Sequence, residues 1–214
     1  MISILLVDDH PMLRQGVAQL IELEEELSVV GQAGDGLEAI KLAELLDPDM
    51  ILLDLNMEGM GGLETLAVMR SKGITSSILV FTVSDDHDDV IGSLRAGADG
   101  YLLKDSEPEE LLAAIKRAGQ GQQVFSPQLA QIMAQALRKP ASQKVDLLAQ
   151  LTPRELEILR LLGNGRANKE IGRQLIIAES TVKVHVKNLL KKLSLRSRLE
   201  AGLWAVENNI LSEE

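Results

Sequence analysis

The chain has 214 residues, of which 45% are hydrophobic, so it can form one or two domains with real cores and is not globally disordered. It has no cysteine, which excludes disulfides and thiolate metal sites. The net charge of −10 is uneven, with −15 in residues 1–120 and +6 in residues 151–200. A basic segment in an acidic chain indicates a nucleic-acid-binding part joined to something else. The plainer alternative is a solvated surface of uneven charge.

No apolar run approaches the roughly 18 residues that span a bilayer, and no basic and apolar leader opens the sequence. We therefore expect a cytoplasmic protein with no membrane partner.

The first 120 residues alternate short apolar runs with segments of helical spacing. Strands are predicted at 2–9, 28–33, 50–54, 77–83 and 100–103. Helices are predicted at 11–23, 36–46, 62–70, 86–95 and 107–118. Continuous Ile, Leu and Val runs indicate strands covered on both faces. Strands that alternate with helices then predict a doubly wound parallel sheet, an α/β domain of the flavodoxin-like (βα)5 kind.

The rest of the chain follows a different pattern. Residues 121–150 predict a linker that contains a helix near 127–137. Beyond it the spacing is helical throughout, with helices predicted at 152–165, 168–175, 178–193 and 196–209. Thr152, Pro153 and Glu155 open the first of these with a capping box. The predicted fold class is therefore α/β plus all-α, with domains at 1–120 and 151–214.

Polar residues gather where the predicted strands end. Asp8 and Asp9 end the first strand and Asp54 ends the third, and the carboxyl ends of such strands share the edge where ligands bind. Carboxylates held together repel one another unless a cation lies among them, and oxygen ligands suit Mg²⁺. Thr82 and Lys104, at the ends of the last two strands, add a hydroxyl and an ammonium that suit phosphoryl chemistry.

Each of these residues also has an ordinary interpretation. Asp8 and Asp9 can cap the first helix, Thr82 can be a plain strand residue, and Lys104 can be a solvated lysine. His10, directly after the acid pair, fits a helix start better than the site.

Four blocks in register resemble the signature motifs of bacterial response-regulator receiver domains. They are LLVDDHP at 5–11, ILLDLNM at 51–57, FTVS at 81–84 and DGYLLKD at 99–105. The resemblance implies that Asp54 accepts a phosphoryl group from a sensor histidine kinase. It also implies that Asp9, Asp54 and the Asn56 carbonyl bind Mg²⁺, with Asp8 assisting.

The same resemblance implies that Thr82 and Tyr101 form a switch pair and that Lys104 contacts the phosphate. After phosphorylation Thr82 would approach the phosphate and Tyr101 would follow into the space behind it. Two positions depart from the pattern, because Glu58 and Asp105 stand where many receivers have proline. We therefore expect a more flexible and more negative loop at Glu58, and no cis-proline bond after Lys104.

The basic end of the chain is typical of a helix-turn-helix. Three lysines recur at a spacing of four in the predicted recognition helix, and an apolar stripe lies opposite. The apolar positions are Val182, Val186, Leu189, Leu190 and Leu193. A basic stripe on such a helix suits the major groove of double-stranded DNA, whereas the plainer interpretation is a cationic solvent face.

This region resembles the LuxR/FixJ-type DNA-binding domain through LTPRELEILRLL, NKEIGRQL and STVKVHVKNLLKKL. The resemblance places Lys183, Val184 and Lys187 at base edges and Lys191 and Lys192 toward phosphates. Residues 196–209 would form a homodimer contact on DNA, and RNA polymerase is a candidate partner.

Two positions depart from the LuxR/FixJ pattern in ways that affect the helices. Ala178 stands where relatives have a capping Ser or Thr, so Ser180 is the alternative cap. Gly172 replaces a usual alanine and should weaken its helix.

Taken together, the blocks resemble the NarL/FixJ family of two-component regulators, and within it the nitrate/nitrite regulators NarL and NarP. The family implies a transcriptional regulator rather than an enzyme, whose receiver covers the recognition helix until phosphorylation. Two alternatives remain open at this point. One is a Mg²⁺-dependent phosphohydrolase, although Asn56 lacks the acid that such enzymes place there. The other is a constitutive DNA-binding protein with an inactive receiver.

Overall fold

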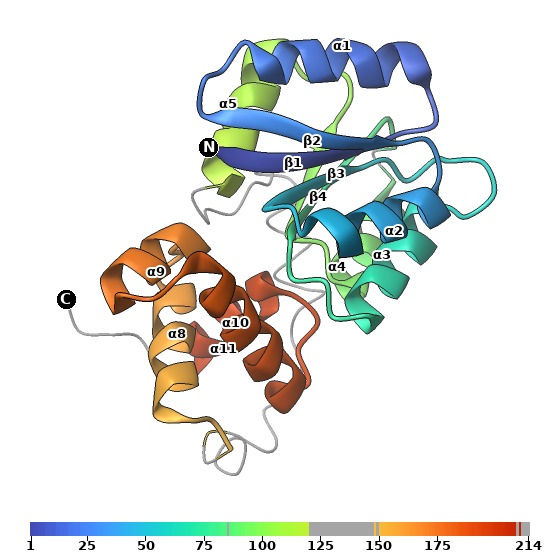
Figure 1. Cartoon of the computed structure of the whole chain (residues 1–214). Coiled ribbons are helices and arrows are strands. Elements are labelled where there is room, and N and C mark those ends of the chain that lie inside the picture. The colour runs from blue at the N-terminus through green and yellow to red at the C-terminus, as the bar shows by residue number, and fades with distance from the viewer. Residues whose placement is uncertain (85, 120–147, 149, 209, 211–214) are drawn as a thin grey trace.

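The computed structural model describes residues 1–84, 86–119, 148, 150–208 and 210 (Figure 1). They form a sheet wrapped by helices, followed by an all-helical unit, as the sequence predicts. The helix expected near 127–137, and nearly all of the linker expected at 121–150, lie outside the described residues. No described helix is long and apolar enough to cross a membrane.

Five strands form one parallel sheet. They are β1 (Ile2–Val7), β2 (Leu27–Ala33), β3 (Met50–Leu53), β4 (Ser77–Thr82) and β5 (Gly100–Leu103). Their spatial order is β2-β1-β3-β4-β5, and every neighbouring pair is parallel. All residues of β3 and β4 are buried, which is why these strands appear as unbroken apolar runs. The predicted flavodoxin-like sheet is confirmed.

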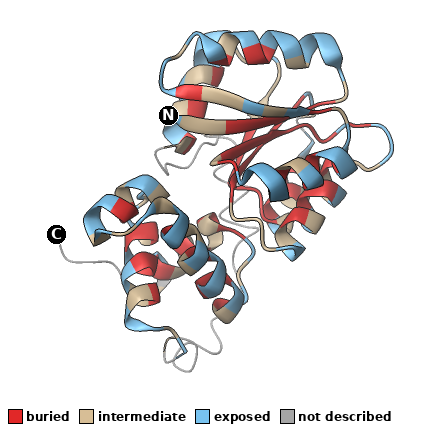
Figure 2. Ribbon diagram, in the orientation of Figure 1, coloured by how far each residue is buried: buried red, intermediate tan, exposed pale blue. Residues whose placement is uncertain are grey.

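Helices cover both faces of the sheet. They are α1 (Pro11–Glu22), α2 (Gly36–Leu46), α3 (Gly62–Ser71), α4 (His87–Ala96) and α5 (Pro108–Gly119). α1 and α5 lie on one face, and α2, α3 and α4 lie on the other (Figure 1). Each face has its own apolar cluster, which appears as buried ribbon between the layers in Figure 2.

The central strands bring Asp54 to the carboxyl edge of the sheet. β3 lies between β1 and β4, and the Asp54 N–H continues the ladder by donating to the Val7 carbonyl at 2.9 Å. A side chain at Gly62 would meet the Asp54 carbonyl oxygen at 2.1 Å. Only glycine therefore lets α3 begin this close to the end of β3.

The helical unit has four described helices around a third apolar cluster. They are α8 (Pro153–Gly163), α9 (Asn168–Leu175), α10 (Glu179–Leu193) and α11 (Arg198–Glu207). The predicted capping box at Thr152 is present. All five residues of the predicted apolar stripe on α10 are buried, so that prediction is confirmed.

The turn between α9 and α10 corrects one expectation and gives a structural reason for Gly172. α10 begins at Glu179, and neither Ala178 nor a later serine caps it with a side chain, so the cap expected from Ser180 is wrong. A side chain at Gly172 would meet the Ile177 carbonyl oxygen at 2.8 Å. Gly172 therefore permits the close turn, which a residue with a side chain would crowd.

The helical unit meets the sheet-containing unit at the edge where the strands begin. Asp49 directly precedes β3 and lies near Lys183 of α10, while Asp99 directly precedes β5 and accepts from the Leu199 N–H of α11. Asp54 follows β3 at the opposite edge. Four residues of strand at about 3.3 Å each separate the two edges.

Candidate functional site

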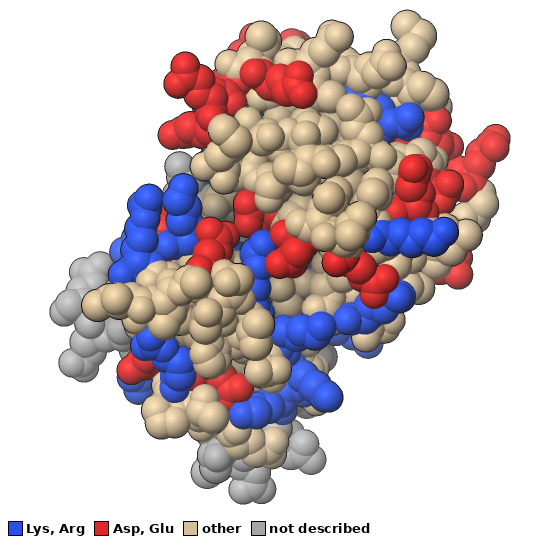
Figure 3. All heavy atoms as spheres, in the orientation of Figure 1, with Lys and Arg blue, Asp and Glu red and all other residues tan. Residues whose placement is uncertain are grey.

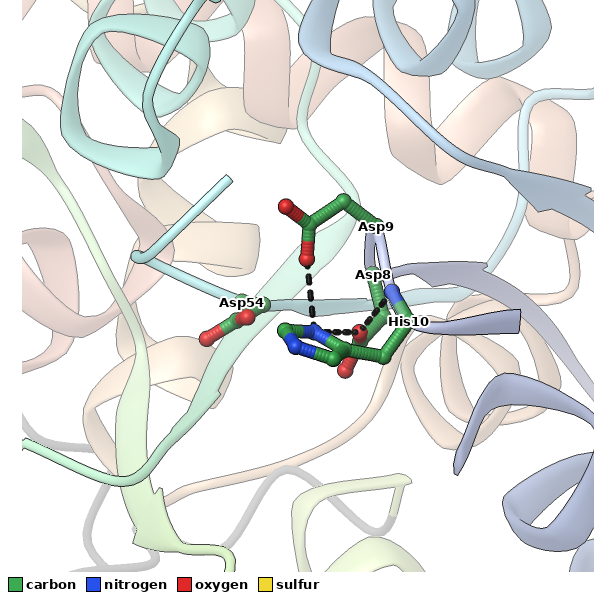
Figure 4. Close-up of side chains that lie close together, drawn as sticks. All are labelled: Asp8, Asp9, His10 and Asp54. Carbon is green, nitrogen blue, oxygen red and sulfur yellow. Dashed lines mark hydrogen bonds and ion pairs between the residues drawn. The ribbon is translucent and has the colours of Figure 1, made fainter. Parts of the chain in front are cut away.

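Four side chains converge at the carboxyl edge of the sheet. Asp8, Asp9 and His10 follow β1, Asp54 follows β3, and one ligand atom from each lies within 4.8 Å of the others (Figure 4). The predicted meeting of the three carboxylates is thus present in the structure. His10 joins them, which the sequence did not favour.

Lys104 lies between two of these acids. Its Nζ is 2.7 Å from Asp8 Oδ2 and 2.8 Å from Asp54 Oδ2, and its side chain is only 8% exposed. Its backbone N–H donates to the Thr82 carbonyl at 2.8 Å, which fixes its position after β5. Burial lowers the pKa of Lys104, but the hydrogen bonds and negative charges of Asp54 and Asp8 outweigh it and raise that pKa above its ordinary value.

The two carboxylate oxygens of Asp54 have different surroundings. The residue is 2% exposed, and its Oδ2 contacts Lys104. Its Oδ1 is buried and has no hydrogen-bond partner among the described residues. An unpaired buried carboxylate oxygen is costly, so this atom marks the position where a ligand or a covalent group fits.

Asp9 is held by its neighbours in a way that the sequence did not reveal. Its Oδ2 accepts from the Glu58 backbone N–H at 3.0 Å, and its Oδ1 lies 2.7 Å from His10 Nδ1. The backbone N–H of His10 donates to Asp8 Oδ1 at 2.8 Å, and no side chain caps the start of α1. The interpretation of Asp8 and Asp9 as mere helix caps is therefore wrong. Glu58 is useful through its amide, which proline lacks.

The other predicted site residues follow the same edge. Thr82 is fully buried, and its Oγ1 lies 3.4 Å from Asn56 Nδ2 and 3.4 Å from the Ser84 backbone N. Tyr101 is buried as well, and its hydroxyl donates to the Ser84 carbonyl at 2.8 Å. Ser84 in turn donates to Asp89 of α4 at 2.5 Å. The Tyr101 side chain is thus already buried in this structure, whereas we expected it to move inward on phosphorylation.

The residues predicted to read DNA occupy several environments. Lys183 is largely covered by the sheet-containing unit, where its Nζ donates to the Asp47 carbonyl at 2.8 Å and lies 3.4 Å from both the Asp47 and Asp49 carboxylates. Lys187 passes so close to Gly73 that a side chain there would meet its Cε at 2.6 Å. Part of the predicted recognition helix thus faces the acidic loop of Asp47 and Asp49, and Figure 3 shows blue and red atoms side by side between the two units.

The other three residues predicted to contact DNA do not face the first unit in the same way. Val184 and Lys191 are exposed. Lys192 instead places its Nζ 2.6 Å from Oε2 of the buried Glu155. Burial raises the pKa of Glu155, but its hydrogen bonds with Lys192 and Thr152 outweigh burial and lower that pKa below its ordinary value. Lys192 therefore also holds α10 against the start of α8.

A carboxyl pair adds to the contact between the two units. Glu179, the first residue of α10, shares a hydrogen bond with Asp49. Burial, together with that hydrogen bond and the charge of Asp49, raises the pKa of the Glu179 carboxyl. Asp49 is also fixed from behind, since its Oδ2 accepts from the Ser3 N–H at 2.9 Å and the Ser3 hydroxyl at 2.8 Å.

Comparisons with known protein families match both units. Residues 4–116 match the response regulator receiver domain, and residues 149–205 match the bacterial regulatory proteins of the luxR family. The two matches fall on the sheet-containing unit and on the helical unit.

Individual relatives align along nearly the whole chain. The nitrate/nitrite response regulator protein NarL of Escherichia coli (strain K12) is 53% identical, over 97% of this chain and 96% of that protein. The nitrate/nitrite response regulator protein NarP of the same organism is 50% identical, over 94% and 93%. The crystal structure of the response regulator ChrA of a heme-sensing two-component system is 30% identical, covers 98% of both chains and has a TM-score of 0.51. The chain therefore belongs to the two-component response regulators that join a receiver domain to a DNA-binding domain of the luxR family.

Proposed function

We propose that Asp54 accepts a phosphoryl group from a sensor histidine kinase and that this event controls DNA binding. The observation that carries the proposal is the unpaired, buried Oδ1 of Asp54 beside the Lys104 ammonium. That oxygen is the nucleophile: it attacks the phosphorus of a phosphohistidine, a P–O bond forms as the P–N bond breaks, and the imidazole of the kinase histidine leaves. Lys104 is fully charged at neutral pH and stabilises the negative charge of the transferred group.

The acid cluster fits Mg²⁺. Asp9 and Asp54 would hold the ion, with Asp8 assisting, because their carboxylates are hard oxygen ligands grouped at one edge. The Asn56 carbonyl, two residues after Asp54, would add a further oxygen ligand. A bound Mg²⁺ supplies charge neutralisation for the incoming phosphoryl group. Glu58 positions Asp9 through its backbone N–H, so that one carboxylate keeps its orientation as the ligands assemble.

Thr82 and Tyr101 act as the switch pair. The Thr82 hydroxyl already lies beside Asn56 and the Ser84 N–H, so it reaches the phosphorylated site with a small movement. Because Tyr101 and Asp89 both bond to Ser84, a shift at Thr82 reaches β5 and α4 together. Asn56 has no carboxyl group, so it cannot act as the general acid of a phosphohydrolase at that position.

In the resting arrangement, the receiver masks part of α10. Lys183, Val184 and Lys187 contact base edges when α10 enters the major groove, and Lys191 and Lys192 lie toward phosphates. Lys183 cannot do so while it bonds to Asp47. The contrast between an acidic receiver and a basic helical domain explains why the two attract each other at rest.

The wider assignment rests on the likeness to NarL and NarP. We propose a cytoplasmic transcription regulator in nitrate- or nitrite-responsive control. Its receiver spans 1–120, its linker 121–150 and its DNA-binding domain 151–214. Residues 196–209 form the homodimer contact on DNA, so the operator has two-fold symmetry. RNA polymerase is the partner that such a dimer contacts at a promoter.

Incubation with acetyl phosphate and Mg²⁺, followed by intact mass measurement, tests the phosphoacceptor. One phosphoryl group should appear on the native chain and none on Asp54→Asn. No gain on the native chain supports a constitutive DNA-binding protein, and steady turnover of a phosphomonoester supports a phosphohydrolase. Selection of DNA from a random pool, with and without phosphorylation, tests masking and operator symmetry in one experiment. Equal binding by Asp54→Asn and phosphorylated native protein would contradict control by phosphorylation.

A further inference from the structure

The start of α11 is fastened to the loop between α4 and β5. The Leu199 N–H donates to Asp99 Oδ1 at 3.2 Å, and the Leu199 side chain is buried within an apolar cluster otherwise built mainly from the receiver. Arg196 donates to the Arg95 carbonyl. Gly97 has φ of +104°, and a side chain there would lie 3.2 Å from Arg196 Cβ, so glycine permits the approach. We call these five residues the α11 latch.

Asp99 is a rigid anchor for this latch. Its Oδ2 accepts from Arg70 at 2.6 Å and from the Ile78 N–H at 2.9 Å, and both charged side chains are almost fully buried. Arg70 also donates to the Gly97 carbonyl at 2.9 Å, which ties the α4–β5 loop to α3. The negative charge at the first turn of α11 adds a favourable helix-dipole interaction.

The receiver side of the latch is continuous with the switch residues. Asp99 precedes Tyr101 by two positions, at the start of β5. Tyr101 bonds to Ser84, which bonds to Asp89 in the first turn of α4, while Arg95 lies in the last turn of the same helix. Movement of α4 or β5 therefore displaces the latch directly.

The contact made by α10, which we define as Lys183 and Glu179 with Asp47 and Asp49, is built differently. Lys183 donates to the Asp47 carbonyl at 2.8 Å, but both of its ion pairs are 3.4 Å long, and solvent screens the one with the exposed Asp47 carboxylate. Asp49 is held by Ser3 of β1 rather than by α4 or β5. This contact covers the recognition helix, but Asp49 on its receiver side is anchored to β1 and not to the elements that carry the switch residues.

On the function proposed above, we propose that phosphorylation separates the two domains by releasing the α11 latch, whereas the α10 contact only covers the recognition helix. Asp99, Leu199 and Arg196 are then positioning residues for the signal. When the receiver no longer binds α11, the helix proposed to pair with a second chain on DNA, the recognition helix is freed as a consequence.

The absence of cysteine allows a clean distance measurement in the full chain. Spin labels on Lys41→Cys of α2 and Arg160→Cys of α8, both exposed, report the interdomain distance by pulsed electron resonance. The ratio of separated to docked molecules is measured before and after acetyl phosphate and Mg²⁺ treatment. Three backgrounds are compared with the native one, namely Leu199→Ser, Arg196→Ala and Lys183→Ala as the matched α10 control.

In the native background phosphorylation should raise that ratio by about 5- to 150-fold. In Leu199→Ser and Arg196→Ala the ratio should already be high, and phosphorylation should change it by no more than about twofold. In Lys183→Ala the full phosphorylation response should remain. A native-sized response in both latch variants, or its loss only in Lys183→Ala, would overturn the inference.

Intact mass on the same samples separates this inference from the proposed function. If the native chain gains no phosphoryl group, the proposed function itself fails. If the chain is phosphorylated but both latch variants keep a native-sized change in the ratio, only the role of the latch is overturned. Leu199 packs with the receiver cluster and not with the core of the helical domain, so its replacement leaves that core intact. Arg196 is exposed, so Arg196→Ala decides between the same outcomes should Leu199→Ser fold poorly.

Discussion

The backbone N–H of Glu58 donates to Asp9 Oδ2 at 3.0 Å and so links the loop after β3 to the acid pair after β1. Glu58→Pro removes that donor and leaves the carboxylate less well held. We expect the Kd for Mg²⁺ to rise roughly tenfold, because a hydrogen bond to a charged group contributes about 1.5 kcal/mol. Isothermal titration of the full chain with Mg²⁺ measures the change. Glu58→Ala keeps the N–H, so a comparable loss in that variant would show that the side chain is what matters.

Lys104 is the counter-charge for two buried carboxylates. Lys104→Ala should lower the free energy of unfolding by about 3 kcal/mol without Mg²⁺, since it leaves Asp8 and Asp54 uncompensated. Added Mg²⁺ should recover more stability in the variant than in the native chain. Urea unfolding followed by circular dichroism, with and without Mg²⁺, gives both numbers.

The surface pair of Lys116 and Glu24 is the control, since both side chains are about one third exposed. Lys116→Ala should change stability by no more than about 1 kcal/mol, and Mg²⁺ should not correct it. Equal losses in the two variants would contradict a special role for Lys104.

Gly172 allows the turn between α9 and α10 to close. Gly172→Ala gains up to about 1 kcal/mol of helix propensity, but its new side chain meets the Ile177 carbonyl, and such overpacking costs about 1–3 kcal/mol. We expect net destabilisation of the helical domain, read by the fluorescence of Trp204 in α11, the one tryptophan of the chain. A methyl group added at Gly16 in α1 would meet nothing within 4 Å, so Gly16→Ala should stabilise instead.

The helical domain should lose stability in acid through Glu155. Its pKa in the folded chain is lowered below the ordinary value of 4.5, because Lys192 and Thr152 bond to the charged form. Such a group stabilises the fold above its unfolded pKa, and this contribution is lost as the pH falls through the lower folded pKa. The loss of stability from pH 6 downward, followed by Trp204 fluorescence, should be less steep in Glu155→Gln, and an unchanged slope would exclude the mechanism.

The fold and the carboxyl-edge site could be predicted because both follow from local patterns. Unbroken apolar runs identify strands covered on both faces, and acids at their ends fall on one edge by topology alone. Asp8, Asp9, Asp54 and Lys104 were found this way.

The contact between the domains could not be predicted in this way. Asp49 and Asp99 directly precede β3 and β5, so they stand as close to strand ends as Asp54, which follows β3. Acids at the starts of strands, however, also suit ordinary turns. Their roles depend on which helix docks there, and no periodicity in one element encodes its partner in another domain. The contact of Glu58 with Asp9 could not be predicted for a related reason, because it is made by a backbone amide that nearly every residue type has and proline lacks.

The placement of input and output at opposite edges of the sheet has a consequence for the order of events. Asp49 and Asp54 bracket the same short strand, so the helical domain docks roughly 16 Å from the proposed phosphoacceptor, at about 3.3 Å for each residue. On the function proposed above, a phosphodonor can approach Asp54 while the chain is still closed, and the DNA-binding domain does not compete with the proposed kinase for one surface. Signal capture and signal release become separate steps, and the resting chain is receptive without being active.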